Sequence, residues 1–434
     1  MLHVTARVAI GAPASRRRRP RGEASAPNGC PAPPCYRGRV DRSELVELLS
    51  PEGLRLLDAL PEWDSKTDVL RTVEALRAQG HSPGLVAAVL SQSKLRHRAG
   101  AKFGEFAHRM LFTEAGLEQA TRLQVAALHA GRYTRAGIGH VADLGCGIGG
   151  DAMAFAALGV EVTAADADEV TAAVAAYNLT PFPHATVLHA RAEDVALGGI
   201  GGAWLDPARR AVTGGRTRRL ADAADYSPPL EFAFGLAERM PVGVKLGPGT
   251  DRDVIPAGTE AQWVSVDGDV VELAVWSGAL ARPGIGRSAL VIRGGEASEL
   301  SAVADSEDAP VGPLGDYLYE PDGAVIRARL IGDLARANGG WMLSSGIAYV
   351  TADRAFDSPF AQRFRVIERL PTDERRLRQA LAERGVGVLE VKKRGIDVDP
   401  AALRTRMKLK GDASATIVLT REEGRHVTLL VERD

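Results

Sequence analysis

A glycine-rich loop flanked by two acids is the stretch of this chain with the clearest chemistry. VADLGCGIGGDA places Asp143 before Gly145, Gly147 and Gly149, directly ahead of a helical pattern. Glycines permit positive φ values and let backbone amides approach a bound group, and the helix start behind them favours an electron-rich ligand. Asp166 follows 21 residues after Gly145, where the second strand of a βαβ unit presents a carboxylate to ribose hydroxyls. This spacing predicts a site for a ribose-containing cofactor.

A further acid ends an apolar run in WLDPARR, at residues 204–210. Asp206 and Pro207 stand where a strand gives way to a loop, and ligands of α/β proteins bind at such strand ends. Two arginines follow where an aromatic residue is the more familiar neighbour. The stretch is either a catalytic loop for an amine-bearing base or an ordinary strand exit, and the surrounding elements have to decide between them.

Short apolar runs alternate with Ala-rich helical stretches from His140 onward. HVADLG, VEVTAAD, ATVLHA, GAWLD and VGVKLG have strand length, and this alternation predicts a parallel sheet covered by helices on both faces. AQWVSVDGDVVELAVWSG is typical of an antiparallel hairpin turning at Asp267-Gly268. Five parallel strands closed by a hairpin fit a Rossmann-like methyltransferase sheet better than a nicotinamide dehydrogenase sheet.

The glycine loop and the acid after it carry a resemblance. DLGCGIGGD followed by VTAADAD resembles the S-adenosylmethionine-binding motifs of class I methyltransferases. Within them the chain is most similar to the RNA cap guanine-N2 (trimethylguanosine synthase-like) group, which also has Gly-Gly after the loop. The resemblance implies that Asp143 and the backbone of Gly145–Gly149 hold the methionine moiety of S-adenosyl-L-methionine, and that Asp166 binds its ribose. Dinucleotide binding is the alternative, but the spacing is G-x-G-x-G-G and not G-x-G-x-x-G.

The third cofactor motif departs from the family pattern. Many members have an acid that contacts the adenine amine where VLHARAEDV has Arg191. Glu193 or Asp194 would replace that acid, and the usual geometry at a strand end favours Asp194. The alternative is that Asp194 only caps the next turn.

WLDPARR occupies the position of the (D/N/S)-P-P-(Y/F/W) loop of amino-group methyltransferases. A carboxylate and a backbone carbonyl accept the hydrogens of the attacking amine and aim its lone pair. Asp206 is the expected acceptor, with the carbonyl of Pro207 as its partner. Ala208 replaces the second proline and Arg209 the stacking aromatic, although a guanidinium plane also stacks on bases or grips phosphates. A covalent C5-pyrimidine mechanism is disfavoured because this loop contains no cysteine.

Downstream, DYSPPLEF repeats the missing motif in Ser227-Pro228-Pro229. Because proline is common at the first turn of a helix, we interpret this segment as a helix start. Tyr226 is then a candidate for contact with the substrate.

The segments on either side of the sheet contain basic clusters. SKLRHRAGAKFGEFAHRM includes Lys102, and Glu118, Gln119 and Thr121 follow where related enzymes have a segment over the cofactor. VKKRGIDVDPAALRTRMKLKG includes Lys392, Lys393 and Arg394, with seven basic residues against two acids. Such a cluster is either a phosphate-binding surface or a solvated face. The C-terminal part also resembles the THUMP-like domain of bacterial methyltransferases, and true THUMP domains bind RNA.

Composition restricts the other possibilities. The 434 residues carry a formal net charge of -1, so any nucleic-acid-binding surface must be local. No apolar run reaches the ~18 residues of a membrane span, and the three cysteines show no metal-binding spacing. We therefore expect a cytoplasmic protein without a metal and without a membrane partner.

The domain organisation follows from these patterns. We expect a disordered tail over residues 1–40, a helical domain over 41–135, an S-adenosylmethionine-binding domain over 136–283 and a THUMP-like α/β domain over 284–434. The predicted activity is methylation of a nitrogen of an RNA base, in tRNA or rRNA. The basic faces around Lys102 and Lys393 are expected to hold the RNA backbone. The alternatives are a small-molecule N- or O-methyltransferase, and a catalytically inactive RNA-binding protein with this fold.

Overall fold

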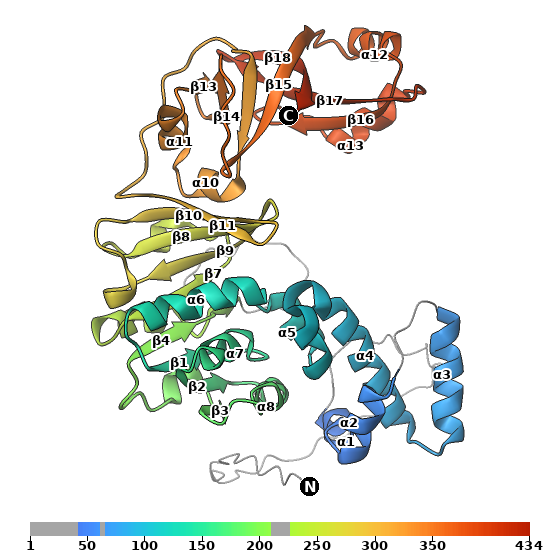
Figure 1. Cartoon of the computed structure of the whole chain (residues 1–434), viewed down its shortest axis with the longest axis vertical. Coiled ribbons are helices and arrows are strands. Elements are labelled where there is room, and N and C mark those ends of the chain that lie inside the picture. Colours follow the sequence, from blue (N-terminus) through green and yellow to red (C-terminus); the bar gives the residue numbers. More distant parts are fainter. Residues whose placement is uncertain (1–41, 61–65, 210–225) are drawn as a thin grey trace, which may run out of the picture. The chain divides into compact units, whose positions relative to one another are not determined.

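A computed structural model describes residues 42–60, 66–209 and 226–434 (Figure 1). The tail expected at residues 1–40 lies outside these ranges. The chain forms two compact units, Met1–Val242 and Gly243–Asp434. None of the helices in the described ranges combines the length and the apolar character needed to cross a membrane.

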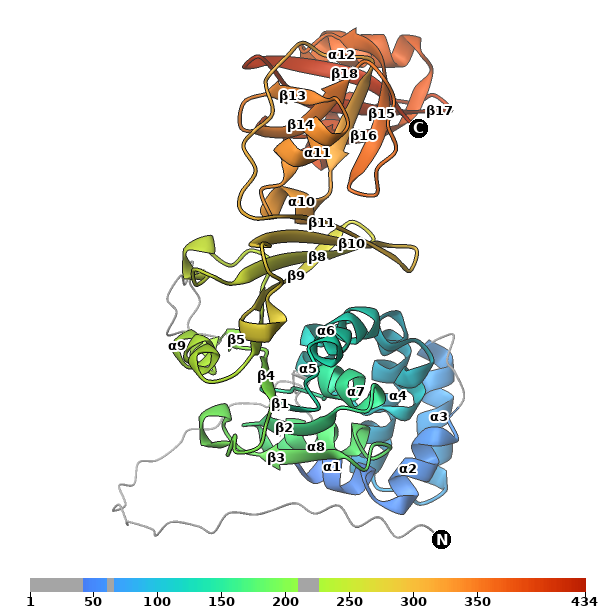
Figure 2. The same cartoon turned by 60° about the vertical axis from the view of Figure 1, so that its left-hand side comes forward.

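The first unit begins with helices, as the spacing of apolar residues predicts. Ser50 and Ser82 cap two of them by accepting hydrogen bonds from the amides of Gly53 and Leu85. The longest helix, α4, packs against α1, α2 and α3 and buries its apolar residues there (Figure 2). The elements are α1 (Arg42–Leu48), α2 (Pro51–Asp58), α3 (Lys66–Ala78), α4 (Pro83–Phe103), η1 (Gly104–Arg109), α5 (Glu114–Gln119) and α6 (Leu123–Arg135).

Four parallel strands follow in the order β4-β1-β2-β3. They are β1 (His140–Leu144), β2 (Glu161–Asp166), β3 (Ala185–His189) and β4 (Gly202–Leu205). Helix α7 (Gly150–Ala157) packs on β1 and β2, and α8 (Glu169–Asn178) packs on β2 and β3. Because the strands are parallel, their carboxyl ends share one edge, where the glycine loop, Asp166 and Asp206 all emerge.

A short ribbon joins two segments that are far apart in the sequence. β5 (Ala208–Arg209) pairs antiparallel with β6 (Tyr226–Ser227), so Ala208 lies opposite Ser227. Helix α9 (Leu230–Gly235) and η4 (Leu236–Glu238) follow. The helix start predicted in DYSPPLEF is confirmed, but its first residues also form this ribbon.

The second unit opens with five strands in the order β11-β10-β8-β9-β7. They are β7 (Val242–Leu246), β8 (Glu260–Val266), β9 (Asp269–Trp276), β10 (Arg287–Arg293) and β11 (Glu296–Ala302), with the short turns η5 (Arg252–Val254) and η6 (Gly278–Leu280). β8 and β9 form the predicted hairpin, turning through Asp267 and Gly268 at positive φ. The boundary expected at residue 283 falls inside this sheet, because β10 pairs parallel with β8 and β11 extends it.

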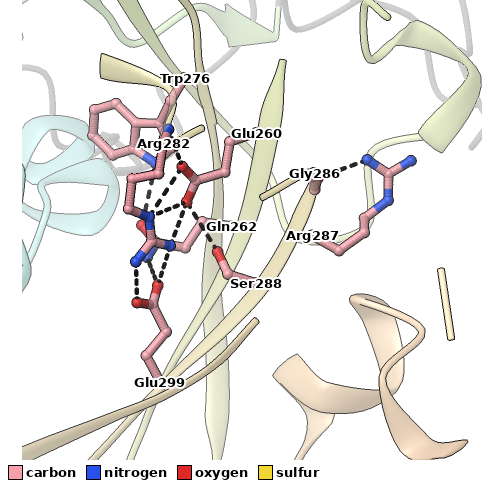
Figure 3. A network of polar contacts seen from close by, with 8 residues as sticks. All are labelled: Glu260, Gln262, Trp276, Arg282, Gly286, Arg287, Ser288 and Glu299. Carbon is pink, nitrogen blue, oxygen red and sulfur yellow. Dashed lines mark hydrogen bonds and ion pairs between the residues drawn. The ribbon is translucent and has the colours of Figure 1, made fainter. Parts of the chain in front are cut away.

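A polar network fixes the segment at residues 280–288, which contains a proline and two glycines (Figure 3). Glu260 is fully buried on β8, and Arg282 approaches it with Nη2 2.6 Å from Oε1. Arg282 also binds Glu299 on β11, with Nη1 2.5 Å from Oε2. Gln262 links Glu299 to the indole of Trp276. The ion pairs of Arg282 therefore order this segment, although its proline and glycine residues are typical of a flexible linker.

The rest of the second unit is a seven-stranded sheet in the order β13-β14-β12-β15-β18-β17-β16, with only the β16–β17 pair parallel. Two short helices, α10 and α11, are separated at Arg329, which adopts φ 60°. The elements are β12 (Tyr317–Pro321), α10 (Gly323–Arg327), α11 (Ile331–Ala337), β13 (Trp341–Ser344), β14 (Ile347–Ala352), β15 (Ala361–Leu370), α12 (Glu374–Glu383), β16 (Val386–Lys393), α13 (Pro400–Met407), β17 (Ala413–Glu422) and β18 (Arg425–Arg433).

Candidate functional site

A cavity of about 350 Å³ lies at the carboxyl edge of the parallel strands in the first unit. Its walls come from the glycine loop, the end of β2, the η2 turn (Ala192–Asp194), the exit of β4 and the segment around α5. This volume is in the range of small-molecule and cofactor sites. The edge of the sheet predicted to hold the cofactor is therefore hollow.

The glycine loop needs its glycines for two reasons. Gly145, Gly147 and Gly149 have φ values of 87°, 55° and 84°. A Cβ on Gly145 would also lie 3.3 Å from the main-chain oxygen of Asp206. Gly145 and Gly147 line the cavity. Gly149 is instead the N-cap of α7, and a Cβ at this position would lie against Ala175. The backbone of the glycine loop, which is predicted to hold the cofactor, therefore lies next to Asp206, the predicted catalytic acid.

Asp166 at the end of β2 also lines the cavity. Its carboxylate accepts hydrogen bonds from the amide of Gly147 at 3.1 Å and the amide of Asp168 at 2.9 Å. Burial raises the pKa of Asp166 above its ordinary value, although these two amides oppose the shift. Its carboxylate is therefore both a support of the loop and a wall of the cavity.

Asp143 occupies a different layer. It is 1% exposed in β1 and does not line the cavity, unlike Cys146 directly above it. Burial, followed by the negative charges of Asp143 and Asp166, raises the pKa of the Cys146 thiol well above its usual value. Asp143 therefore lies beneath the loop, and its predicted contact with the cofactor stays a prediction.

The sequence reasoning missed one acid of the cavity wall. Asp151, in the first turn of α7, lines the cavity, and its carboxylate is held from two sides. Thr121 Oγ1 donates to Oδ2 at 2.7 Å, and His129 Nδ1 lies 2.9 Å from Oδ1. The imidazole also packs on Trp204 with ring centroids 4.4 Å apart. The only sequence signal was the Gly-Gly-Asp that ends the loop.

Two of the three residues expected to lie over the cofactor, in the segment before α6, line the cavity. Gln119 and Thr121 line the cavity, but Glu118 does not. In the third motif, Glu193 lines the cavity and pairs with Arg191, with Nη2 3.0 Å from Oε1. Asp194 is exposed and does not line it. The geometry therefore favours Glu193 over Asp194 for the adenine position, because only Glu193 faces the cavity.

The loop after β4 lies across the cavity from these residues. Asp206 and Ala208 line the cavity, while Pro207 is buried behind them. The β5–β6 ribbon brings Ser227 and Pro228 into the same wall, whereas Tyr226 is buried and does not line it. The backbone of Arg209 is part of the ribbon, and its side chain lies outside the described structure. Ser227-Pro228 thus stands beside the loop whose second half it resembles.

The ammonium group of Lys102 forms hydrogen bonds within the protein. It donates three hydrogen bonds to backbone carbonyls at the end of α5, at 2.8, 2.7 and 2.9 Å from Leu117, Glu118 and Ala120. This arrangement satisfies the carbonyls that a helix end leaves without partners. Lys102 therefore anchors the segment that carries Gln119 and Thr121, a role different from the predicted contact with RNA.

The predicted basic cluster on β16 is divided between two faces. Lys392 Nζ lies 2.6 Å from Glu320 Oε2, and Arg394 Nη2 lies 3.4 Å from Oε1 of the same carboxylate. Both side chains are half-buried, whereas Lys393 is exposed on the opposite face of the strand. Only Lys393 of the three is presented to solvent, because alternate residues of a strand point in opposite directions.

Comparison with known proteins places this site in a family. An uncharacterized S-adenosylmethionine-dependent methyltransferase of Mycobacterium tuberculosis, found in strains H37Rv and CDC 1551, is 36% identical over 356 residues, covering 78% of this chain and 93% of its own length. This chain belongs to the S-adenosylmethionine-dependent methyltransferases. Its cofactor is S-adenosyl-L-methionine, as the glycine loop predicts. The methyltransferase also has no group of His, Cys, Asp or Glu side chains suited to hold a metal ion in its described ranges.

Two further comparisons concern the domains. The crystal structure of a candidate methyltransferase from Porphyromonas gingivalis W83 matches with a TM-score of 0.67 and 20% identity, covering 86% of this chain and all of that one. Residues 361–433 match the THUMP domain-like family, and residues 41–99 match a domain of unknown function, DUF8688. The predicted fold class, a Rossmann-like α/β sheet with N-terminal helices and a C-terminal THUMP-like domain, is confirmed.

Proposed function

We propose that this methyltransferase methylates a nitrogen of an RNA base, in tRNA or rRNA. The observation that carries the proposal is the position of Asp206. This residue lines the cavity, and its main-chain oxygen lies where a Cβ on Gly145 would approach to 3.3 Å. An acceptor for an amine therefore stands next to the loop that holds the cofactor. The likeness to guanine-N2 methyltransferases makes an exocyclic amine the favoured target.

The cofactor roles follow from the cavity wall. Asp166 accepts the ribose hydroxyls, and Glu193 accepts the adenine amine in place of Asp194. Gly145 and Gly147 line the methionine end, with their own amides donating to Ala165 and Asp166, and Asp151 offers a carboxylate to the methionine ammonium group. When bound, S-adenosylmethionine supplies an electrophilic methyl group. Thr121 and His129 hold the Asp151 carboxylate in place, so its orientation does not depend on the ligand.

The loop after β4 orients the attacking nitrogen. Asp206 and the carbonyl of Pro207 accept the amine hydrogens, which directs the lone pair along the line of transfer and stabilises the positive charge that develops. Ser227 and Pro228 supply the second half of this loop from the start of α9, since β6 places them beside Ala208. This arrangement accounts for the absence of a second proline after Asp206.

The RNA partner rests on the THUMP-like domain and on a small basic group. Lys393, Arg404, Lys408 and Lys410 surround α13, and each side chain is exposed or half-exposed. Phosphates of a structured RNA attract such a group. Lys392 and Arg394 are not counted in this basic group, because both side chains pair with the carboxylate of Glu320.

The test is a comparison of modified nucleosides, by mass spectrometry, in RNA from wild-type and deletion cells. We expect one methylated nucleoside to disappear from tRNA or rRNA, and its identity names the base and the atom. Re-expression of the wild-type protein should restore it. An unchanged profile would favour a small-molecule methyltransferase or a catalytically inactive RNA-binding protein.

The proposed role of Asp206 is tested in the same cells and with purified protein. We expect Asp206→Ala to fail to restore the nucleoside and to lower the methylation rate by about a hundredfold, the usual cost of one such polar group. Cofactor affinity should stay within twofold of wild type. Asp194→Asn, at an exposed acid outside the cavity, is the matched control and should retain full activity. Methylation by Asp206→Ala at the wild-type rate would refute the mechanism.

A further inference from the structure

The second unit contains a cavity of its own, of about 410 Å³. It lies between the loop that follows β7, residues 305–308 before β12, the junction of α10 and α11, and strands β13 and β14. It shares no lining residue with the cavity of the first unit. This cavity is therefore a separate candidate site.

Guanidinium groups dominate its charge. Arg252, Arg327 and Arg329 line the cavity together with Asp305 and Asp308. Asp305 is neutralised, since Arg252 Nη2 and Arg287 Nε lie 2.5 and 2.8 Å from its Oδ1. Burial raises the pKa of Asp305, but the two arginines outweigh it and hold the pKa below its usual value. The balance of charge at the cavity is therefore positive.

Two buried polar atoms of the wall have no hydrogen-bond partner in the described structure. Thr250 lines the cavity and is 7% exposed, and its Oγ1 accepts and donates nothing. Arg252 Nε is likewise unsatisfied, while its guanidinium lies 5.6 Å from the ring centroid of Trp263. Unsatisfied buried polar atoms cost free energy, which an oxygen-rich ligand would recover.

Arg329 gives independent support. It has φ 60°, in the left-handed region that favours glycine, at the junction where α10 ends and α11 begins. No hydrogen bond or ion pair engages its side chain within the described part of the chain. Arg329 directly follows Ala328, the C-cap of α10, and a left-handed residue is common at this position. The support therefore comes from the guanidinium, a charge at the cavity wall that no described residue pairs with.

The geometry points to a binding site for the phosphate group of a nucleotide or of an RNA end, held by Arg329, Arg327 and the hydroxyl of Thr250. Arginine suits phosphate because its planar fork makes paired hydrogen bonds to two oxygens. The volume is sufficient for a nucleotide and exceeds what free phosphate requires. The site stands whether or not the first unit methylates RNA.

The experiment measures ligand binding to the full-length protein by calorimetry at fixed ionic strength. The probes are inorganic phosphate, AMP with adenosine as its uncharged control, and one oligoribonucleotide with and without a 5′-phosphate. Arg329→Gly removes the guanidinium and relieves the backbone, so the protein should fold at least as well as wild type. Glu423→Gly is the control for the backbone change, because Glu423 also has φ 46° and lies outside the cavity.

We expect Arg329→Gly and Thr250→Val each to weaken phosphate and AMP binding at least fivefold, while Glu423→Gly leaves both unchanged. Adenosine should bind at least tenfold more weakly than AMP. A preference for the 5′-phosphorylated oligonucleotide that Arg329→Gly abolishes identifies an RNA end as the source, and AMP binding without that preference identifies a free nucleotide. Equal binding by wild type and Arg329→Gly, or no phosphate binding by wild type, would overturn the proposal. Asp206→Ala should bind phosphate normally, which separates this result from the methylation test.

Discussion

Asp166 is the residue at which the proposed ribose contact and the structure of the glycine loop meet. Its carboxylate accepts hydrogen bonds from two backbone amides, yet burial raises its pKa. Ribose hydroxyls would donate more strongly to the ionised form and would therefore lower that pKa on binding. Binding and deprotonation of this one carboxyl group are thus coupled.

We predict that cofactor affinity falls as the pH drops through the raised pKa of Asp166. Protonation removes the acceptor, so the bound state is stabilised above this pKa and loses that stabilisation below it. Asp166→Asn should weaken binding at neutral pH by about 2 kcal/mol, near thirtyfold, and should flatten the pH dependence. Calorimetry with S-adenosylhomocysteine between acidic and neutral pH measures both effects. Asp194→Asn is the control, and a steep pH dependence that survives Asp166→Asn would contradict this assignment.

At the scale of elements, helix α4 holds α5 in place through Lys102, in addition to the ion pair between Arg98 and Glu114. Lys102 on α4 satisfies three carbonyls at the end of α5. The residues that follow, Gln119 and Thr121, line the cofactor cavity, and Thr121 holds Asp151. The contact between the helices therefore determines how well this wall is ordered.

We predict that Lys102→Met weakens cofactor binding by about tenfold and lowers the free energy of unfolding by about 2 kcal/mol, because three charge-assisted hydrogen bonds are lost. Lys94→Met is the matched control, since Lys94 is an exposed lysine of the same helix. Titration with S-adenosylhomocysteine and urea denaturation measure the two quantities. Reduced RNA affinity with unchanged cofactor affinity would instead support the role first predicted for Lys102.

The edge strands of the second unit depend on a buried ion pair. We predict that Arg282→Met lowers the free energy of unfolding by about 3 kcal/mol, because it removes the positive charge that faces the fully buried carboxylate of Glu260. Arg406→Met is the control, since its pair with Glu374 is about half-exposed on both sides. Its cost should be ~0.5 kcal/mol. Equal losses in the two variants, measured by urea denaturation, would show that burial of Glu260 is not decisive.

For the molecule as a whole, charge pairing withdraws some of the predicted basic side chains from RNA binding. The net charge is -1, and Lys392, Arg394 and Arg406 are bound to Glu320 or Glu374. Under the proposed function, the group around α13 is the expected source of backbone contacts in the THUMP-like domain. RNA affinity should accordingly depend on salt through a small number of phosphates.

We predict that replacing Lys393, Arg404, Lys408 and Lys410 with glutamine reduces the slope of log affinity against log salt by about 3, since each lost phosphate contact contributes ~0.7 to 0.9. Removing exposed charge elsewhere in the same domain, with Arg375→Gln and Arg378→Gln on α12, is the control and should leave the slope unchanged. Fluorescence anisotropy with labelled tRNA over a salt series provides the measurement. An identical loss in both variants would show that the effect is one of net charge only.

The sequence by itself determined the cofactor edge of this protein. Strand, glycine loop, helix and second strand are consecutive, so the spacing from Gly145 to Asp166 already reflects their arrangement in space. The same holds for the β8–β9 hairpin, whose turn lies between its two strands. Local geometry limits how such short segments fold, and the sequence pattern is enough to predict them.

Only the tertiary structure decided which side chains share the cavity wall. Asp151 gains its partners from Thr121 and His129, and Ser227 reaches Ala208 across a sheet register. The choice of Glu193 over Asp194 depends on the direction of a single turn, and the amine of Lys102 is taken by carbonyls that face it only after α4 and α5 pack. These contacts join residues that no local pattern relates, because packing of distant segments, and not spacing along the chain, sets their distances.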